Sequence, residues 1–371
     1  MAIQQSSISM LLHLLTLLVA AAATLHPRHG KTADYTLPPV FTPAYVKDVG
    51  LNVACHNASA GYEATLRPGN YTSNGFFDCF RTRGQIDAFL TTLEAQNRRL
   101  LTSLPLATSI RGVPIVAYKL SIRRNFTAPA IYVQSMMHAR EWVAGSSNLY
   151  ALASFLDELA ANRTPPALAK YDMYFVPIVN VDGYDKTWSG DDYGESRYTR
   201  KDAHQVDLNR NFPTLAFNHD HESVDSEAYP GTSPLSEPES KGIADFISAT
   251  PMDGFFDIHS YSALVLYPFG DTTAPPRGNR FKVLSQSVAD ALNNATGITS
   301  YKGAPAYELY PCYGTFIDYA YRKYDKAAVT IEIAGSDFVE KVDRIRLHGA
   351  AIYAAQNAFA NGLEAFNNAH V

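Results

Sequence analysis

The chain has 371 residues, of which 46% are hydrophobic, 12% aromatic and 18% charged, a composition that excludes intrinsic disorder and supplies enough apolar material for a large core. Lys and Arg number 31 against 36 Asp and Glu, giving a formal net charge of −5, so no basic excess favours nucleic acid or an anionic membrane. Three cysteines are too few for a disulfide scaffold.

The N-terminus carries a short apolar run at residues 10–23 that ends in small residues, although no Lys or Arg precedes it. We predict a signal peptide over residues 1–23, with cleavage near Ala23 or Thr24. The alternative is a membrane anchor, but the run is shorter than the roughly 20 residues that span a bilayer. No later segment is long and apolar enough to do so.

Features beyond the leader also point to secretion. Asn-x-Ser/Thr sequons stand at Asn57, Asn70, Asn125, Asn162 and Asn294. Together with the leader they predict a secreted glycoprotein. In an oxidising compartment Cys55 and Cys79 could pair, which would leave Cys312 as a small buried hydrophobe.

Residues 24–79 are rich in Pro, Gly, Asn, Thr and Tyr and show no long helical period. We interpret them as an N-terminal extension or short pro-segment. From Phe80 the pattern changes to alternating helices and strands, which predicts one large domain over residues 80–371.

The first element of that domain is a helix expected over residues 85–104. Strands are expected at 116–122, 130–137, 173–180, 254–261 and 327–333. Helices are expected at 142–161, 237–249, 278–296, 315–322 and 337–367. The near-continuous apolar strands predict an α/β fold whose mixed, mostly parallel sheet of about eight strands is covered by helices on both faces.

Polar residues follow two of these strands. The strand at 130–137 ends in His138-Ala-Arg-Glu141, and the strand at 254–261 carries His259. Two imidazoles and a carboxylate suit Zn²⁺ and leave a fourth position open for water. Each piece alone also fits a plainer interpretation, a solvated loop for His138 and Glu141 and a half-buried histidine for His259.

Six ordered sequence blocks carry a resemblance that covers about four-fifths of the chain. They are HAREW (138–142), PIVNVDGY (177–184), VDLNRNFP (206–213), YPGTSPLSEPES (229–240), IHSYSALVLYPFG (258–270) and TIEIAG (330–335). In this order they resemble the zinc metallocarboxypeptidases of the pancreatic carboxypeptidase A/B-like family.

The resemblance implies one zinc ion per chain, held by His138, Glu141 and His259, with Glu332 as general base. A carboxylate is needed to take the proton from the zinc-activated water. For Glu332 in the apolar run VTIEIAG the alternative is a structural ion pair, yet a buried carboxylate there marks a functional candidate.

The resemblance also assigns an arginine that stabilises the oxyanion. It favours Arg197, although Ser196 replaces the usual preceding tryptophan and the following stretch is shorter than in the animal enzymes. Arg200 therefore remains an alternative.

Substrate-binding residues follow from the same blocks. Asn209 and Arg210 match the pair that grips the terminal carboxylate of the substrate. Arg140 matches a more distant substrate contact. Tyr310 matches the mobile closing tyrosine, with Tyr307 and Tyr313 nearby. Tyr261 matches a subsite tyrosine and could equally be a core aromatic.

Specificity is expected to depend on the floor of the pocket for the terminal side chain, where Ile317 falls. An apolar floor leaves a buried Lys or Arg without a partner, so we predict preference for aromatic or branched aliphatic C-terminal residues. If the match to the family were shifted by one residue, Asp318 would lie at the floor of the pocket instead of Ile317.

The sequence therefore predicts a secreted, extracellular zinc carboxypeptidase that acts on peptides or proteins with a free C-terminal carboxylate. We expect a monomer, without nucleic acid and without a membrane span. The alternatives are an inactive peptide-binding homologue and a zinc amide hydrolase of other specificity. The extension would be either an inhibitory segment or a permanent arm held by Cys55–Cys79.

Overall fold

The computed structural model describes residues 43–123, 128–190, 195–215 and 222–369. All of them belong to one compact unit, Pro38–Val371. The predicted leader and the sequon at Asn125 lie outside the described residues. Among the described helices, none combines the length and the apolar character that a membrane crossing requires.

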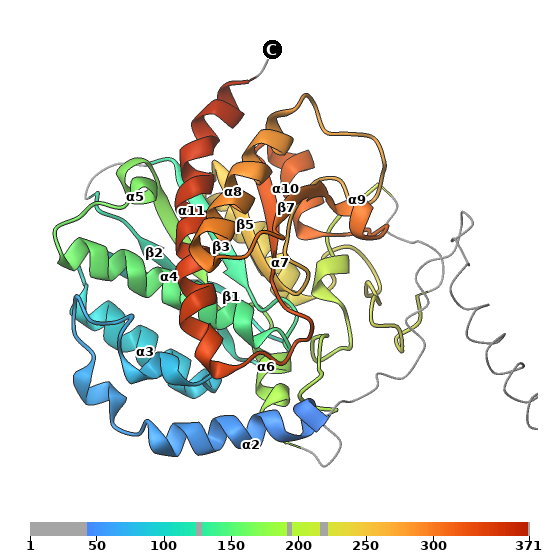
Figure 1. Ribbon diagram of the computed structural model, residues 1–371. Helices are drawn as coiled ribbons and strands as arrows, with labels where there is room; N and C mark the ends of the chain where they lie inside the picture. The colour runs from blue at the N-terminus through green and yellow to red at the C-terminus, as the bar shows by residue number, and fades with distance from the viewer. Residues whose placement is uncertain (1–42, 124–127, 191–194, 216–221, 370–371) are drawn as a thin grey trace, which may run out of the picture. The chain divides into compact units, whose positions relative to one another are not determined.

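An eight-stranded mixed sheet forms the centre of the described chain (Figure 1). Its strands are β1 (Leu101–Thr108), β2 (Pro114–Leu120), β3 (Ala130–Ser135), β4 (Asp172–Val176), β5 (Gly254–Ser260), β6 (Leu264–Tyr267), β7 (Lys302–Pro305) and β8 (Ala327–Ile333). The spatial order is β1-β2-β4-β3-β5-β8-β6-β7. The central strands β4, β3, β5 and β8 are mutually parallel, so their carboxyl ends meet at one edge.

Ten helices surround the sheet in the described residues. They are α2 (Pro43–Ala58), α3 (Arg83–Gln96), α4 (Trp142–Ala160), α5 (Pro166–Lys170), α6 (Val181–Thr187), α7 (Pro238–Ala249), α8 (Arg280–Thr296), α9 (Ala306–Leu309), α10 (Phe316–Tyr324) and α11 (Ile345–Asn368). Short 3₁₀ turns lie at Tyr62–Thr65, Gly75–Asp78, Leu208–Arg210 and Val342–Arg344.

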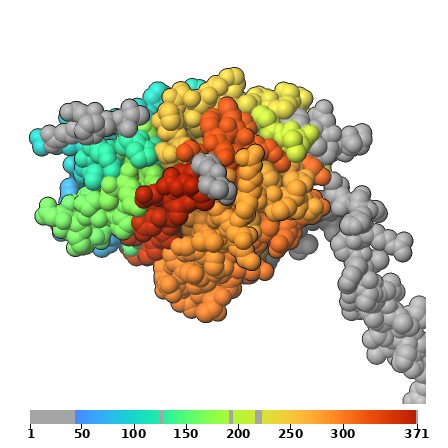
Figure 2. Space-filling view, turned by 90° about the horizontal axis from the view of Figure 1, so that it is seen from above, coloured from blue at the N-terminus to red at the C-terminus, as the bar shows by residue number. Residues whose placement is uncertain are grey.

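Helices cover both faces of the sheet, as predicted. Adjacent residues of β5 point to opposite faces: Phe256 packs on Phe359 of α11, whereas Phe255 packs on Phe316 of α10. On the first face α11 lies between α4 and α8 (Figures 1 and 2). The α/β prediction is therefore confirmed.

The predicted elements agree best where the strands are central and apolar. The five predicted strands correspond to β2, β3, β4, β5 and β8. The helix expected over 85–104 is wrong in its last part, because α3 ends at Gln96 and residues from Leu101 form the edge strand β1. β1 contains Pro105, which an edge strand tolerates because the missing N–H can face away from the sheet. The last helix begins at Ile345 rather than at 337.

The predicted N-terminal extension contains a helix, α2, that its amino-acid composition does not predict. α2 runs for 16 residues, and the buried side of this helix carries polar residues, Asp48 and Asn52, which leave no apolar period for sequence analysis to detect. The missing helical period of residues 24–79 therefore does not mean that this segment lacks a helix.

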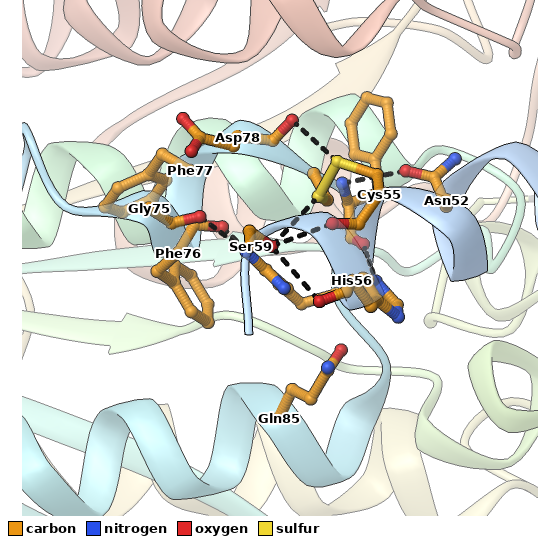
Figure 3. Close-up of a disulfide and its surroundings, with 12 residues drawn as sticks. Asn52, Cys55, His56, Ser59, Gly75, Phe76, Phe77, Asp78 and Gln85 are labelled. Atoms are coloured by element: carbon orange, nitrogen blue, oxygen red, sulfur yellow. Dashed lines mark hydrogen bonds between the residues drawn. A yellow bond between two sulfur atoms is a disulfide. The ribbon is translucent and has the colours of Figure 1, made fainter. Parts of the chain in front are cut away.

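A disulfide joins Cys55 of α2 to Cys79, as predicted, with the two Cα atoms 5.9 Å apart (Figure 3). It closes a loop with a sequence separation of 24, for which the chain-entropy model gives about 3.5 kcal/mol. Cys312 is free and buried, as expected.

Candidate metal centre

The three predicted metal ligands converge at the carboxyl ends of β3 and β5. His138 and Glu141 lie in the turn between β3 and α4, and His259 lies near the end of β5. Glu141 Oε1 is 2.8 Å from His138 Nδ1, and Glu141 Oε2 is 3.1 Å from His259 Nδ1. One ligand atom from each residue lies within 4.8 Å of the others, and all three residues are buried.

Two further carboxylates orient the imidazoles. His138 Nε2 donates to Asp207 Oδ1 at 3.1 Å, and His259 Nε2 donates to Asp257 Oδ2 at 2.9 Å. A proton on each Nε2 leaves a lone pair on each Nδ1, the atom that faces the cluster. These two Nδ1 atoms are 3.0 Å apart and each also faces a Glu141 oxygen, so the three groups are placed to bind one cation together.

The electrostatics of the cluster also favour a cation. Although burial opposes the charged form, the Asp257 and Glu141 carboxylates raise the pKa of His259 well above its usual value. Burial likewise opposes ionisation of Glu141, but His138 and His259 hold its pKa below the usual range. Two imidazoles and one carboxylate in this arrangement fit Zn²⁺.

Asp207 connects the ligand cluster to two arginines. This buried carboxylate accepts hydrogen bonds from Arg200 Nε at 3.0 Å and Nη2 at 2.6 Å, and Arg210 Nη1 is 4.0 Å away. Against the cost of burial, Arg200 and Arg210 keep the pKa of Asp207 well below its usual value. The same pairing brings Arg200 Nη1 within 3.2 Å of His138 Nδ1.

Arg197, favoured by the sequence for the oxyanion role, does not join this cluster. Its guanidinium stacks on the Trp142 ring at 3.8 Å and is ion-paired with Asp48 at 2.6 Å. With only 1% of its surface exposed, Arg197 is enclosed by these partners. The geometry therefore replaces Arg197 by Arg200 as the candidate arginine beside the metal ligands.

The residues expected to bind the terminal carboxylate lie next to Asp207. Arg210 Nη2 donates to Tyr310 Oη at 3.2 Å, and Asn209 Oδ1 accepts from the Phe316 amide at 2.9 Å. Gly314 has a φ of +66°, and a Cβ there would lie 2.0 Å from the Arg210 carbonyl oxygen. A glycine is thus required for the chain to pass against Arg210.

Glu332 pairs in register with His259 in neighbouring parallel strands, so both side chains point to the same face of the sheet. Desolvation raises the pKa of Glu332 to about 7. A carboxyl group with a pKa near neutrality can both accept and return a proton.

Ile317 is buried in the first turn of α10. The carboxylate of its neighbour Asp318 accepts from the Gly270 amide at 2.9 Å and lies 3.7 Å from Arg322 Nη1. Asp318 is therefore held by the Gly270 backbone and by Arg322.

Arg140 and Tyr261 lie at an aromatic wall beside the ligand turn. The Arg140 guanidinium lies against the rings of Tyr198 and Phe338, at 4.2 and 4.1 Å from their centroids, and pairs with Glu227 at 2.8 Å. The Tyr261 ring packs on Phe338 at 4.9 Å.

Sequence analysis missed the roles of Asp207 and Asp257. Each lies two residues before a predicted site residue: Asp207 precedes Asn209 inside a quoted block, and Asp257 precedes His259 just ahead of the block that begins at Ile258. The signal that could have identified Asp257 is the strand period, since residues i and i+2 share a face. Asp207 offers no such signal, because it lies in a turn.

Comparisons with known proteins agree with this geometry. The family model described as "Zinc carboxypeptidase" matches residues 86–351. Carboxypeptidase A1 of Sus scrofa is 30% identical over 289 residues, covering 74% of this chain and 66% of that protein, slightly less than two thirds. Carboxypeptidase B of Bos taurus is 27% identical over 319 residues, covering 81% and 75%. The crystal structure of carboxypeptidase A from Helicoverpa armigera superposes with a TM-score of 0.72 at 25% identity, covering 86% and 81%.

A second buried acidic group, Asp202, Glu237 and Glu239, lies apart from the zinc ligands. Its donors are all carboxylates, and His204 Nδ1 lies 2.7 Å from Glu237 Oε2. Burial raises the pKa of Asp202 to about 8 and that of Glu239 to about 7. The folded protein therefore holds a proton at Asp202 more tightly than the unfolded chain does.

This raised pKa predicts the pH dependence of an Asp202→Asn variant. Wild-type stability decreases as the pH rises from the unfolded pKa near 4 towards the folded value near 8, whereas Asn has no proton to lose. The free energy of unfolding of the variant, relative to wild type, should increase between pH 5 and pH 8 by on the order of 4 kcal/mol, because each pKa unit corresponds to about 1.4 kcal/mol. Urea unfolding at pH 5 and pH 8 measures it, with the exposed Asp245→Asn as control. A difference that is independent of pH would contradict the assignment.

Proposed function

Because the chain belongs to the zinc carboxypeptidase family, we propose that it is a secreted metallocarboxypeptidase that removes the C-terminal residue of peptides and proteins. The observation that carries the proposal is the convergence of His138, Glu141 and His259, with Glu332 in register beside His259. The predicted leader supports secretion, as does the exposure of the sequons at Asn57, Asn162 and Asn294.

The terminal carboxylate of the substrate is proposed to pair with Arg210, aided by Asn209, while Tyr310 closes over the bound residue. Arg210 is 8% exposed, and a desolvated guanidinium favours bidentate pairing with a carboxylate. Arg140 and Tyr261 are proposed to contact the substrate further from the scissile bond, along the aromatic wall with Phe338.

Zn²⁺ held by the three ligands would supply a Lewis acid that makes a water nucleophilic at neutral pH. Glu332 accepts the proton from the attacking water and returns it to the leaving amine. Arg200, fixed by Asp207, donates to the carbonyl oxygen as negative charge develops there. Arg200 takes this role instead of Arg197 because its Nη1 lies 3.2 Å from His138 Nδ1, whereas all three nitrogens of Arg197 donate to Asp48, the Arg140 carbonyl and the Phe338 carbonyl.

A Glu332→Gln variant tests the general base. Glutamine keeps the size of the side chain but cannot accept the proton, so kcat should fall by about 10²–10⁴-fold while bound zinc is retained. Hydrolysis of a blocked dipeptide, together with metal analysis, measures both quantities. The exposed Glu364→Gln on α11 is the matched control.

A chelator should abolish wild-type activity, and added zinc should restore it. Wild-type rates for Glu332→Gln, or activity that survives complete removal of zinc, would refute this mechanism.

Substrate preference tests the role of Ile317. Peptides that differ only in the last residue should release Phe or Leu at least about 10-fold faster than Arg or Lys, because an apolar floor cannot pair a buried cation. The same peptides with an amidated C-terminus should resist cleavage, since they cannot pair with Arg210. Faster release of Arg than of Phe would contradict the assignment.

A further inference from the structure

Arg197 joins three segments of the chain at one buried guanidinium. Nε donates to Asp48 Oδ2 of α2 at 2.6 Å, Nη1 donates to the Arg140 carbonyl at 2.7 Å, and Nη2 donates to the Phe338 carbonyl at 3.1 Å. Arg140 stands between the metal ligands His138 and Glu141. The guanidinium therefore holds the backbone of the metal-ligand turn.

The buried face of α2 is built to hold Asp48 in this position. Asp48 Oδ1 accepts from Asn52 Nδ2 at 3.1 Å, and Asn52 Oδ1 accepts from the Phe80 amide at 3.0 Å. One turn earlier, Tyr45 donates to Asp337, and its ring packs edge-on against Tyr198 at 5.2 Å. The helix thus binds the domain through polar contacts at regular helical spacing.

The far end of α2 is fixed independently. The Cys55–Cys79 disulfide ties it to the last residue of the extension (Figure 3), and the carbonyl of the next residue, Phe80, lies 2.6 Å from His56 Nε2. The His56 ring also packs on Trp188 at 5.5 Å. A covalent bond and polar contacts therefore hold both ends of the helix.

Removing α2 would leave Arg197 without its counter-ion. The Asp48 and Arg197 side chains are 6% and 1% exposed, and an unpaired buried charge is strongly destabilising. Arg197 could regain hydration only by moving away from Trp142 and from the Arg140 carbonyl. The metal-ligand turn would then lose the donor that fixes its backbone.

We propose that α2 is a permanent part of the folded enzyme that stabilises the metal centre, not a removable pro-segment. Arg197 is the positioning residue: Asp48 of α2 holds its guanidinium, which in turn fixes the backbone of the turn carrying His138 and Glu141. The inference rests on the metal centre of the proposed function and not on its substrate. It also assigns a function to Arg197, which is not the arginine proposed to stabilise the oxyanion.

Zinc affinity, measured by competition with a chromophoric chelator, tests the positioning role. Asp48→Asn should weaken zinc binding by about 10-fold or more, the effect typical of groups that orient metal ligands. The exposed Asp245→Asn on α7, which removes a surface carboxylate of the same kind, should bind zinc as wild type does.

The double variant Asp48→Leu/Arg197→Met separates positioning from stability. Replacing a buried ion pair by apolar side chains commonly preserves folding, but it leaves the Arg140 carbonyl without its donor. Zinc affinity should remain at least about 10-fold weaker than in wild type. Wild-type affinity in this variant would show that Arg197 serves stability alone and would overturn the positioning role.

Mass spectrometry of the secreted, zinc-loaded protein tests permanence. Under reducing and non-reducing conditions the mature chain should begin before Pro43 and should retain α2. A zinc-loaded protein that lacks residues 43–58 would overturn the proposal. Neither readout depends on peptide hydrolysis, so an inactive enzyme would refute the proposed function and leave this inference to its own tests.

Discussion

The buried carboxylate of Asp207 is the interaction on which the site depends. It accepts from His138, which fixes the metal-facing nitrogen of that imidazole, and from Arg200, which it brings beside the same nitrogen. Arg210 lies within 4.0 Å of it. One anion, itself kept ionised by these partners, thus sets the spacing between the candidate metal ligand His138 and the guanidinium groups of Arg200 and Arg210.

The sheet supplies the second constraint. β3, β5 and β8 are parallel neighbours, so residues at their carboxyl ends share one edge. Register then pairs His259 with Glu332 and aligns Asp257 with Gln134, whose amide donates to it at 3.0 Å. Every residue of β3 and β5 is buried, so a shift of register would move apolar side chains out of contact with the helices on either face.

The sequence predicts those parts of the site that lie within short motifs at the ends of strands. His138, Glu141, His259 and Glu332 lie in or just after apolar strands, and the ordered blocks that resemble the carboxypeptidase family select them. The choice between Arg197 and Arg200 depends on which guanidinium Asp48 captures, a contact across 149 positions. α2 escapes detection because it buries polar residues, and β1 because an edge strand with Pro105 resembles a helix end.

His138, Glu141 and His259 are expected to hold one zinc ion together, and the zinc content of the purified protein tests this expectation most directly. Metal analysis after exhaustive dialysis should find about one zinc per wild-type chain. A folded His259→Ala variant, which keeps only two of the ligands, should retain far less. A wild-type protein without zinc, or a variant that still holds a full equivalent, would contradict the account.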